Sequence, residues 1–279
     1  MTHTTRFHRW IRPSMLLVWI CLGAVTAQAQ LRLNLTGTEK FFLAYEPVPV
    51  RLEIENFTGT LLALGQEPHT DWLRLRVTTE EGTLVPATAE AMKSPVLDIP
   101  AGRQAVVDIN VSRFFAAREP GTYFVQAVVN LGPGEEFTSP YVSFDISPGQ
   151  TIWSQKIGFT SAGKSEKRHY RLMKQVRGRY MRLFLRVDDE ENQLIYGVYN
   201  LGMLVSSDQP SIRIDKDSRL WILHRVAPRT HRCSVYDPMH HKIVDRYFDS
   251  SRSAPRLMMD EDGGIEIVGG REIVGRTET

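Results

Sequence analysis

Hydrophobic and polar residues alternate along much of the first half of the chain, with the period of two that half-buried β-strands show. The alternation is clearest in residues 48–57, 73–77 and 105–111, where Val, Leu and Ile stand between charged or polar residues. More continuous apolar runs occupy residues 122–129 and 141–146. Short strands at roughly even spacing, separated by turn residues, predict an all-β chain with a β-sandwich over residues 30–148.

One tyrosine refines the prediction for this sandwich. Pro120-Gly121-Thr122-Tyr123 leads directly into an apolar strand. This resembles the corner before the penultimate strand of immunoglobulin-like domains, and the resemblance implies that the Tyr123 hydroxyl bonds back to the preceding loop. Residues 45–59 also resemble the second strand of macroglobulin-like and related bacterial immunoglobulin-like modules. Both resemblances concern the fold alone.

The second half of the chain contains a repeated hairpin pattern. Residues 210–223 and 255–268 each begin with Pro, alternate into an acidic turn and continue as an apolar run, and the copies lie 45 residues apart. A period of about 40–45 residues with such a hairpin resembles the blades of a β-propeller. Residues 150–279 have room for about three such units, whereas a closed propeller needs about four or more. The pattern therefore predicts an open antiparallel β-meander of blade-like units after a boundary near Pro148.

Residues 1–29 have the composition of a secretory signal peptide. A basic beginning is followed by an apolar run over residues 15–25, which is short for a membrane span. Ala27 and Ala29 supply the small residues that a signal peptidase reads. The pattern predicts a signal helix that is cleaved before Gln30 and leaves no membrane span, and it places the protein in the periplasm or extracellular space. An uncleaved anchor is the alternative.

The mature chain is close to neutral. The full sequence has 34 Lys and Arg against 32 Asp and Glu, and the signal carries three arginines and no acid. Such a balance gives no general affinity for polyanions, so nucleic acid is not expected as a specific target. Of the two cysteines, Cys21 leaves with the signal and Cys233 remains. An exported chain without a disulfide depends on its hydrophobic core, which suits bacterial export.

Residues 158–165, GFTSAGKS, fit the phosphate-loop pattern G-x-x-x-x-G-K-[ST] in full. In such a loop, glycines let backbone N–H groups wrap the phosphates, the lysine meets the β- and γ-phosphates, and the hydroxyl binds magnesium. The fold that uses this loop needs parallel strands that alternate with helices, and the sequence downstream shows no such alternation. A helix that begins at Lys164 would favour nucleotide binding, whereas a strand over residues 169–174 would exclude it.

His224, His231 and Cys233 form a candidate metal site. Residues 220–226 and 231–236 are predicted to pair as a hairpin. If His224 opposes His231, alternation places all three side chains on one face, where two imidazoles and a thiolate could hold zinc or copper. The alternative is a pair of rim histidines beside a buried thiol, because the spacing matches no standard ligand set.

A basic strand supplies the candidate ligand surface. Alternation predicts that Met181, Leu183, Leu185 and Val187 face the core, and that Tyr180, Arg182, Phe184 and Arg186 face solvent. Aromatic residues between arginines can stack on sugars or bases and pair with anions. The expected partner of this surface is an unknown protein or an anionic envelope polymer. The alternative is the solvated face of an amphipathic strand, balanced by the acids that follow it.

The sequence contains neither G-x-S-x-G nor H-E-x-x-H, and it has no paired cysteine motif. The acids Asp215 and Asp217 recur in register as Asp260 and Asp262, which is typical of turn residues. We therefore expect a non-enzymatic interaction or adaptor protein of the bacterial envelope or extracellular space, without a cofactor. A nucleotide-binding protein and a periplasmic metal binder remain the alternatives.

Overall fold

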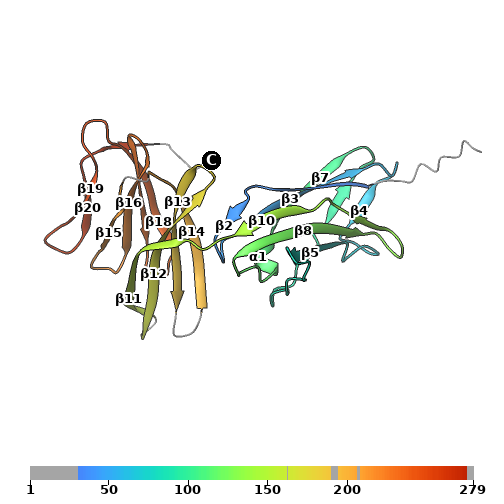
Figure 1. Cartoon of the computed structure of the whole chain (residues 1–279), viewed down its shortest axis with the longest axis horizontal. Helices are drawn as coiled ribbons and strands as arrows, with labels where there is room; N and C mark the ends of the chain where they lie inside the picture. Colours follow the sequence, from blue (N-terminus) through green and yellow to red (C-terminus); the bar gives the residue numbers. More distant parts are fainter. Residues whose placement is uncertain (1–30, 162, 190–193, 206–207, 275–279) are drawn as a thin grey trace, which may run out of the picture.

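A computed structural model describes residues 31–161, 163–189, 194–205 and 208–274. The predicted signal and its cleavage site before Gln30 lie outside these residues. The described chain is built of β-strands apart from one short helix, α1 (Val111–Phe114), which confirms the all-β prediction. Two β-units follow each other along the long axis of the molecule, residues 31–146 on the right of Figure 1 and residues 150–273 on the left. None of the described helical segments is long and apolar enough to cross a membrane.

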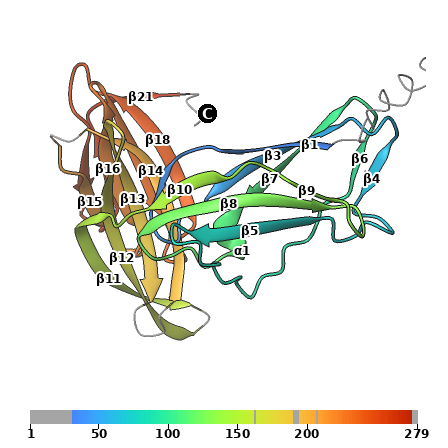
Figure 2. The same ribbon diagram turned by 45° about the vertical axis from the view of Figure 1, so that its right-hand side comes forward.

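The first unit is a β-sandwich. One sheet contains β1 (Leu31–Gly37), β3 (Pro49–Asn56) and β7 (Gln104–Asn110). The other contains β2 (Phe41–Phe42), β10 (Val142–Ile146), β8 (Gly121–Asn130) and β5 (Leu73–Thr79), with β9 (Glu136–Thr138) against β8. A small sheet joins β4 (Leu62–Leu64) to β6 (Leu97–Ile99). The named strands pair antiparallel except β2 and β10, and Figure 2 shows the two main sheets as separate layers.

Alternation along the strands builds the sandwich core. Leu52 and Ile54 of β3 are fully buried, and they belong to the same apolar cluster as Trp72 and Phe144. The predicted tyrosine corner is confirmed, because the Tyr123 hydroxyl donates to the carbonyl oxygen of Glu119 at 2.8 Å. The Tyr123 ring also stacks on Phe144 with their centroids 5.4 Å apart, which ties the corner to the core.

The second unit is an antiparallel meander of three successive sheets. The first sheet contains β11 (Gln150–Ser161), β12 (Lys164–Arg177), β13 (Tyr180–Asp189) and β14 (Leu194–Leu204). The second contains β15 (Ser211–Ile214), β16 (Leu220–Ala227), β17 (Thr230–Tyr236), β18 (Lys242–Asp249) and β21 (Arg271–Ile273). The third contains β19 (Arg256–Met259) and β20 (Ile265–Val268). Over the described ranges, the three sheets form an open series and not a closed ring.

One strand is longer than its sequence predicts. The residues Asn200-Leu201-Gly202 suggest a turn, but β14 continues through them with an irregular register against β13. Gly202 has φ of 88°, which only glycine adopts at low cost, so the backbone bends here without ending the strand. Leu201 remains buried among the residues that fill the space between the first two sheets.

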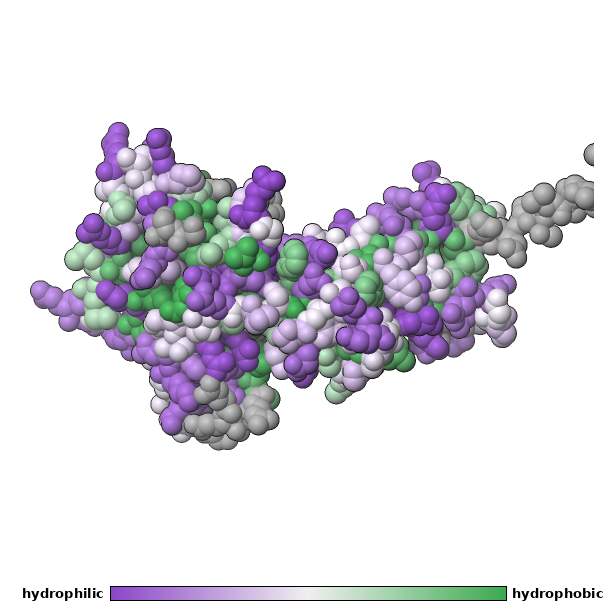
Figure 3. All heavy atoms as spheres, in the orientation of Figure 1, coloured by the Kyte–Doolittle hydropathy of each residue, from purple (hydrophilic) through white to green (hydrophobic). Residues whose placement is uncertain are grey.

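The two copies of the repeated pattern both form hairpins. Ile212 pairs with Ile222, and Leu257 pairs with Ile267 at the equivalent position. The Asp215 carboxylate accepts from the backbone N–H groups two and four residues later, and the Asp260 carboxylate does the same. These acids are therefore turn residues, as their repetition predicts. The space-filling view shows polar side chains over most of one face of both units, with smaller apolar areas between them (Figure 3).

Candidate binding cleft between the two β-units

The basic strand β13 packs against the sandwich and is not a free surface. Phe184 is fully buried in a cluster with Leu43, Met173 and Val198. Leu43 lies in the sandwich and the other members lie in the meander, so this cluster is where the two units meet. The prediction that Phe184 faces solvent is wrong, because β13 is covered on both faces. Leu183, Leu185 and Val187 fill the other face as the alternation predicts.

Arg177, at the end of β12, holds the same contact with polar interactions. Its guanidinium donates to Glu39 at 2.7 Å, forms an ion pair with Glu46, and donates to the Gln175 side chain at 2.7 Å. Gln175 in turn donates to the Ser147 hydroxyl at 2.6 Å. Since Glu39, Glu46 and Ser147 belong to the sandwich side, this network joins the two units and satisfies the buried charge of Arg177.

The predicted ligand residues are largely engaged within the chain. Arg182 forms an ion pair with Glu39 at 2.9 Å, and Arg186 forms one with Asp188 at 2.9 Å. Tyr180 is half exposed at the start of β13. Of the four predicted residues, Tyr180 is therefore exposed and Arg186 lines the adjacent cleft. Arg182 and Phe184 take part in the contact between the two units.

The segment that carries Glu46 is held in a strained backbone. Tyr45 has φ of 68°, a left-handed conformation that bulky residues seldom adopt. The Glu46 carboxylate accepts from the backbone N–H of Leu43 at 2.9 Å, which closes the turn. Burial raises the pKa of Glu46 above its ordinary value, although the contact with Arg177 opposes that rise. The turn directs the Tyr45 ring outward, where it is 37% exposed.

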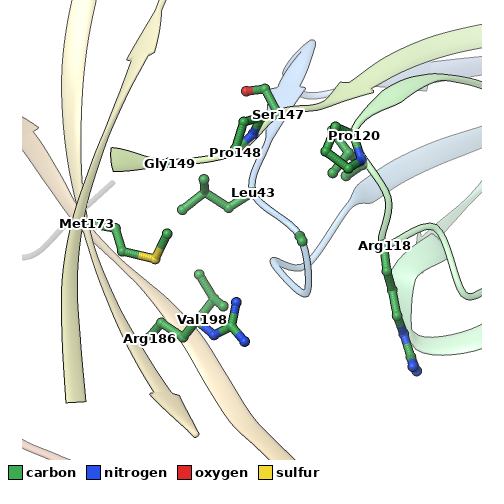
Figure 4. Close-up of a pocket in the computed structure, with 11 residues that line it drawn as sticks. Leu43, Arg118, Pro120, Ser147, Pro148, Gly149, Met173, Arg186 and Val198 are labelled. Carbon is green, nitrogen blue, oxygen red and sulfur yellow. The ribbon is translucent and has the colours of Figure 1, made fainter. Parts of the chain in front are cut away.

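A cleft of about 170 Å³ opens beside this turn (Figure 4). Its apolar wall is formed by Leu43, Met173 and Val198, which point toward one another in the close-up. The other lining residues are Ala44, Arg118, Pro120, Ile146, Ser147, Pro148, Gly149 and Arg186. A Cβ at Gly149 would lie 2.9 Å from Cδ2 of Leu43 and 3.1 Å from Cε of Met173, so the linker approaches the wall as closely as glycine permits.

Two arginines line the cleft, and both contact the Tyr45 ring. The guanidinium carbon of Arg118 lies 5.0 Å from the centre of the Tyr45 ring, and that of Arg186 lies 5.6 Å from it. Arg118 precedes the tyrosine corner of the sandwich, whereas Arg186 lies on β13 of the meander. Sequence reasoning selected Arg186 and missed Arg118, Tyr45 and Leu43, since their approach depends on how the two units pack. Pro120-Gly121-Thr122-Tyr123 was a local signal for the corner but not for the cleft.

The candidate metal residues do not converge. Residue 224 pairs with Arg232, whereas His231 pairs with Arg225 and Cys233 pairs with Leu223. The assumption that His224 opposes His231 is therefore wrong by one residue, and His224 and Cys233 lie on opposite faces of the sheet. Among the described residues, no group of three ligating side chains could hold a metal ion.

Burial also sets the chemistry of these side chains. Nε2 of His224 donates to the Leu201 carbonyl oxygen at 3.1 Å, and burial lowers the pKa of His224 to about 3. Burial raises the pKa of the Cys233 thiol to about 12, so the thiolate that a metal needs is scarce at neutral pH. Both side chains have the character of core residues.

The phosphate-loop pattern lies in a β-hairpin. Gly158 pairs with Lys167 and Thr160 pairs with Ser165, so residues 158–165 connect β11 to β12. The strand β12 then covers residues 169–174, the outcome that excludes the nucleotide interpretation. A phosphate loop requires a helix whose first N–H groups point at the phosphates, and the structure has a strand at that position.

Comparison with known proteins gives little further guidance. No protein-family model matches the sequence, and no curated protein matches it. Among solved structures, the chain is similar to the Pseudomonas fluorescens alkylpurine DNA glycosylase AlkC bound to DNA containing an abasic site analog, with 18% sequence identity and a TM-score of 0.29. The match covers 46% of this chain and 33% of that one, so the chain spans about a third of the matched protein.

This match corrects the predicted partners. The sequence led us to exclude nucleic acid and to expect an unknown protein or an anionic envelope polymer, but the matched protein is bound to DNA. That exclusion is wrong as stated, and the expected partners are withdrawn with it. A likeness with a TM-score of 0.29 carries no argument about this chain's own function, so no residue is assigned to DNA from it.

Proposed function

We propose that the protein is an exported, non-enzymatic binding protein of the bacterial envelope or extracellular space. The observation that carries this proposal is the cleft between the two β-units, with its apolar wall and the two arginines among its lining residues. Residues 1–29 support export through their basic beginning, apolar run and small residues before Gln30.

The polar network around Arg177 supports binding as the activity. It joins the sandwich to the meander, so the cleft walls are held before a ligand arrives. A preorganised site spends less of its binding energy on ordering side chains and loops. Gln175 and Ser147 are engaged in holding the units together, which favours a structural role for them over a chemical one.

Export is tested by expressing the full chain in a Gram-negative host, separating periplasm from cytoplasm, and measuring the intact mass. The expected product is periplasmic and begins at Gln30. A variant with Ala27→Arg and Ala29→Arg should keep its signal, because a signal peptidase requires small side chains at these positions. A soluble cytoplasmic product that retains residues 1–29 would contradict the proposal.

A further inference from the structure

We propose that the edge strand β11 pairs antiparallel with the same strand of a second copy of this chain, about a two-fold axis at Gly158. The sheet that begins with β11 would then continue into the equivalent sheet of the second copy. This inference goes beyond the proposed binding function, and its evidence is independent of the cleft.

The outer edge of β11 offers backbone groups for pairing. β11 is the first strand of its sheet and pairs with β12 alone among the described strands. No other hydrogen bond from the described backbone reaches residues 150–161. Both ribbon views show β11 at the margin of the sheet (Figures 1 and 2). Because the N–H and C=O groups of a strand point alternately to its two sides, about half of those in β11 point outward.

The other edge strands of the meander are short or covered, whereas β11 is neither. β15, β19 and β20 have four residues each, and β21 has three. β14, at the opposite edge of the same sheet, packs against β16 of the next sheet. β11 has twelve residues, with Lys156 as its sole charge and no proline. Proteins protect exposed edges with short strands, charges or proline, so a long edge without them favours pairing with another strand.

The sequence of β11 is complementary to itself. Directly opposed residues of an antiparallel pair point to the same face of the sheet. With the axis at Gly158, Ile157 lies opposite Phe159 of the second copy, and such a pair of β-branched and aromatic side chains is stabilising. Ile157 belongs to the apolar core between the first two sheets, so this pair would extend that core across the dimer. Lys156 lies opposite Thr160 of the second copy, so no like charges meet.

The beginning of β11 is less suited to pairing, which places the axis near its end. The register against β12 shifts between Thr151 and Trp153, which interrupts a regular edge. Trp153 also lines a cavity of about 390 Å³ with Pro210 and Ile212, so another segment of the chain lies beside this part of the strand. An axis at Gly158 uses only residues 155–161. An axis at residue 156 would set two lysines opposite each other, which is destabilising.

Sedimentation equilibrium of the mature protein, residues 30–279, between about 5 and 500 μM tests the association. A contact through one pair of strands is small, so we expect a monomer in dilute solution and a dimer with a Kd of about 0.1 mM. A monomer at every concentration, or assemblies larger than a dimer, would overturn the proposal.

Opposite charges at residue 160 test the register. Thr160 is exposed, and Thr160→Lys would place a lysine opposite Lys156 of the second copy, which should weaken dimerisation at least about tenfold. Thr160→Glu is the matched control, because it sets a carboxylate opposite that lysine and should dimerise at least as tightly as the wild type. Thermal melts establish that both variants are folded. Equal dimerisation of the two folded variants would overturn the proposal.

Disulfide trapping tests the axis directly. A Cβ at Gly158 would meet the carbonyl oxygen of Glu166 at 3.9 Å, so Gly158→Cys fits the strand. Its thiol should oppose that of the second copy and form an intermolecular disulfide under mild oxidation, seen by non-reducing electrophoresis. Ser154→Cys is the exposed control on the same face, and its two copies would lie ~26 Å apart. Cys233 is buried and does not compete. No cross-link in Gly158→Cys, or equal cross-linking in Ser154→Cys, would overturn the proposal.

Discussion

The guanidinium carbon of Arg177 lies 4.6 Å from the centre of the Phe184 ring, in the interior of the contact between the two β-units. Phe42 of the sandwich lies 5.7 Å from the same carbon, so the cation has an aromatic ring from each unit beside it. Cation–π contacts strengthen when water is removed from them. This arrangement explains how the charged Arg177 is buried, together with Phe184, which the alternation assigns to solvent.

Removal of Arg177 should destabilise the protein strongly. Arg177→Met leaves the Glu46 carboxylate buried without its ion-pair partner, which costs about 3–5 kcal/mol in the free energy of unfolding. Urea denaturation followed by tryptophan fluorescence measures this. The double variant Arg177→Met, Glu46→Gln should recover part of the loss, because the uncompensated charge is then gone.

The control for Arg177 is an exposed ion pair of the sandwich. Arg32 lies 3.4 Å from Glu55 with 70% of its side chain exposed, so Arg32→Ala should change the free energy of unfolding by at most about 1 kcal/mol. Equal effects of Arg177→Met and Arg32→Ala would show that the Arg177 network does not hold the units together.

The turn of the repeated hairpin should depend on Asp215. Its carboxylate accepts from the Trp221 indole N–H at 2.9 Å as well as from two backbone groups, so Asp215→Ala should cost about 1–3 kcal/mol. Asp217→Ala, which alters an exposed neighbour in the same turn, should stay within about 0.5 kcal/mol. Thermal denaturation of the two variants makes the comparison, and a larger effect at Asp217 would contradict the assigned roles.

Local pattern predicted much of this fold. The alternation in residues 48–57 predicts β3, and its apolar residues Val50, Leu52 and Ile54 are buried as expected. The bond from Tyr123 to Glu119 follows from one short motif, and the two hairpins follow from a repeat that can be seen without a structure. These features depend on residues close together in sequence, where the period of two and turn chemistry suffice.

The site could not be predicted because it depends on contacts between distant segments. Alternation along β13 predicts that Phe184 is exposed, but it is buried in a cluster that includes Leu43 of the sandwich. The metal hypothesis assumed that His224 opposes His231, and a shift of one residue in the register moved the side chains to opposite faces. The glycines and lysine of residues 158–165 match a motif whose required helix is absent from that position.

Stability should fall at acid pH because of His224. Its pKa is about 3 in the folded protein and about 6.5 in an unfolded chain, so between these values the unfolded chain binds the proton and the folded protein does not. Lowering the pH from 7 to 4 should therefore remove about 3 kcal/mol from the free energy of unfolding through this residue. The lowered pKa values of His231 and His240 act in the same direction.

The variant His224→Gln isolates that contribution. Glutamine can still donate to the Leu201 carbonyl but does not titrate, so the variant should lose less stability than the wild type between pH 7 and pH 4. Urea denaturation at both pH values gives the difference. Parallel losses in the two proteins would mean that His224 is accessible to protons in the folded state.

The Cys233 thiol should be unreactive in the folded protein. It is fully buried with a pKa of about 12, so a thiol reagent at pH 8 meets very little thiolate. Mature protein should show no labelling by a chromogenic disulfide reagent until denaturant is added, and then one thiol per chain, because Cys21 is removed with the predicted signal. Rapid native labelling would contradict the buried position.

The central claim is that β13 joins the two β-units through Phe184. Small-angle X-ray scattering of the mature protein tests it, with Phe184→Asp as the variant and Tyr180→Asp as an exposed control on the same strand. We expect the wild type and Tyr180→Asp to have the radius of gyration calculated from the structure. Phe184→Asp should keep its β-type circular dichroism and show a larger radius of gyration, because a carboxylate cannot stay in the apolar contact. An unchanged radius of gyration in Phe184→Asp, or a wild type as extended as that variant, would contradict the claim.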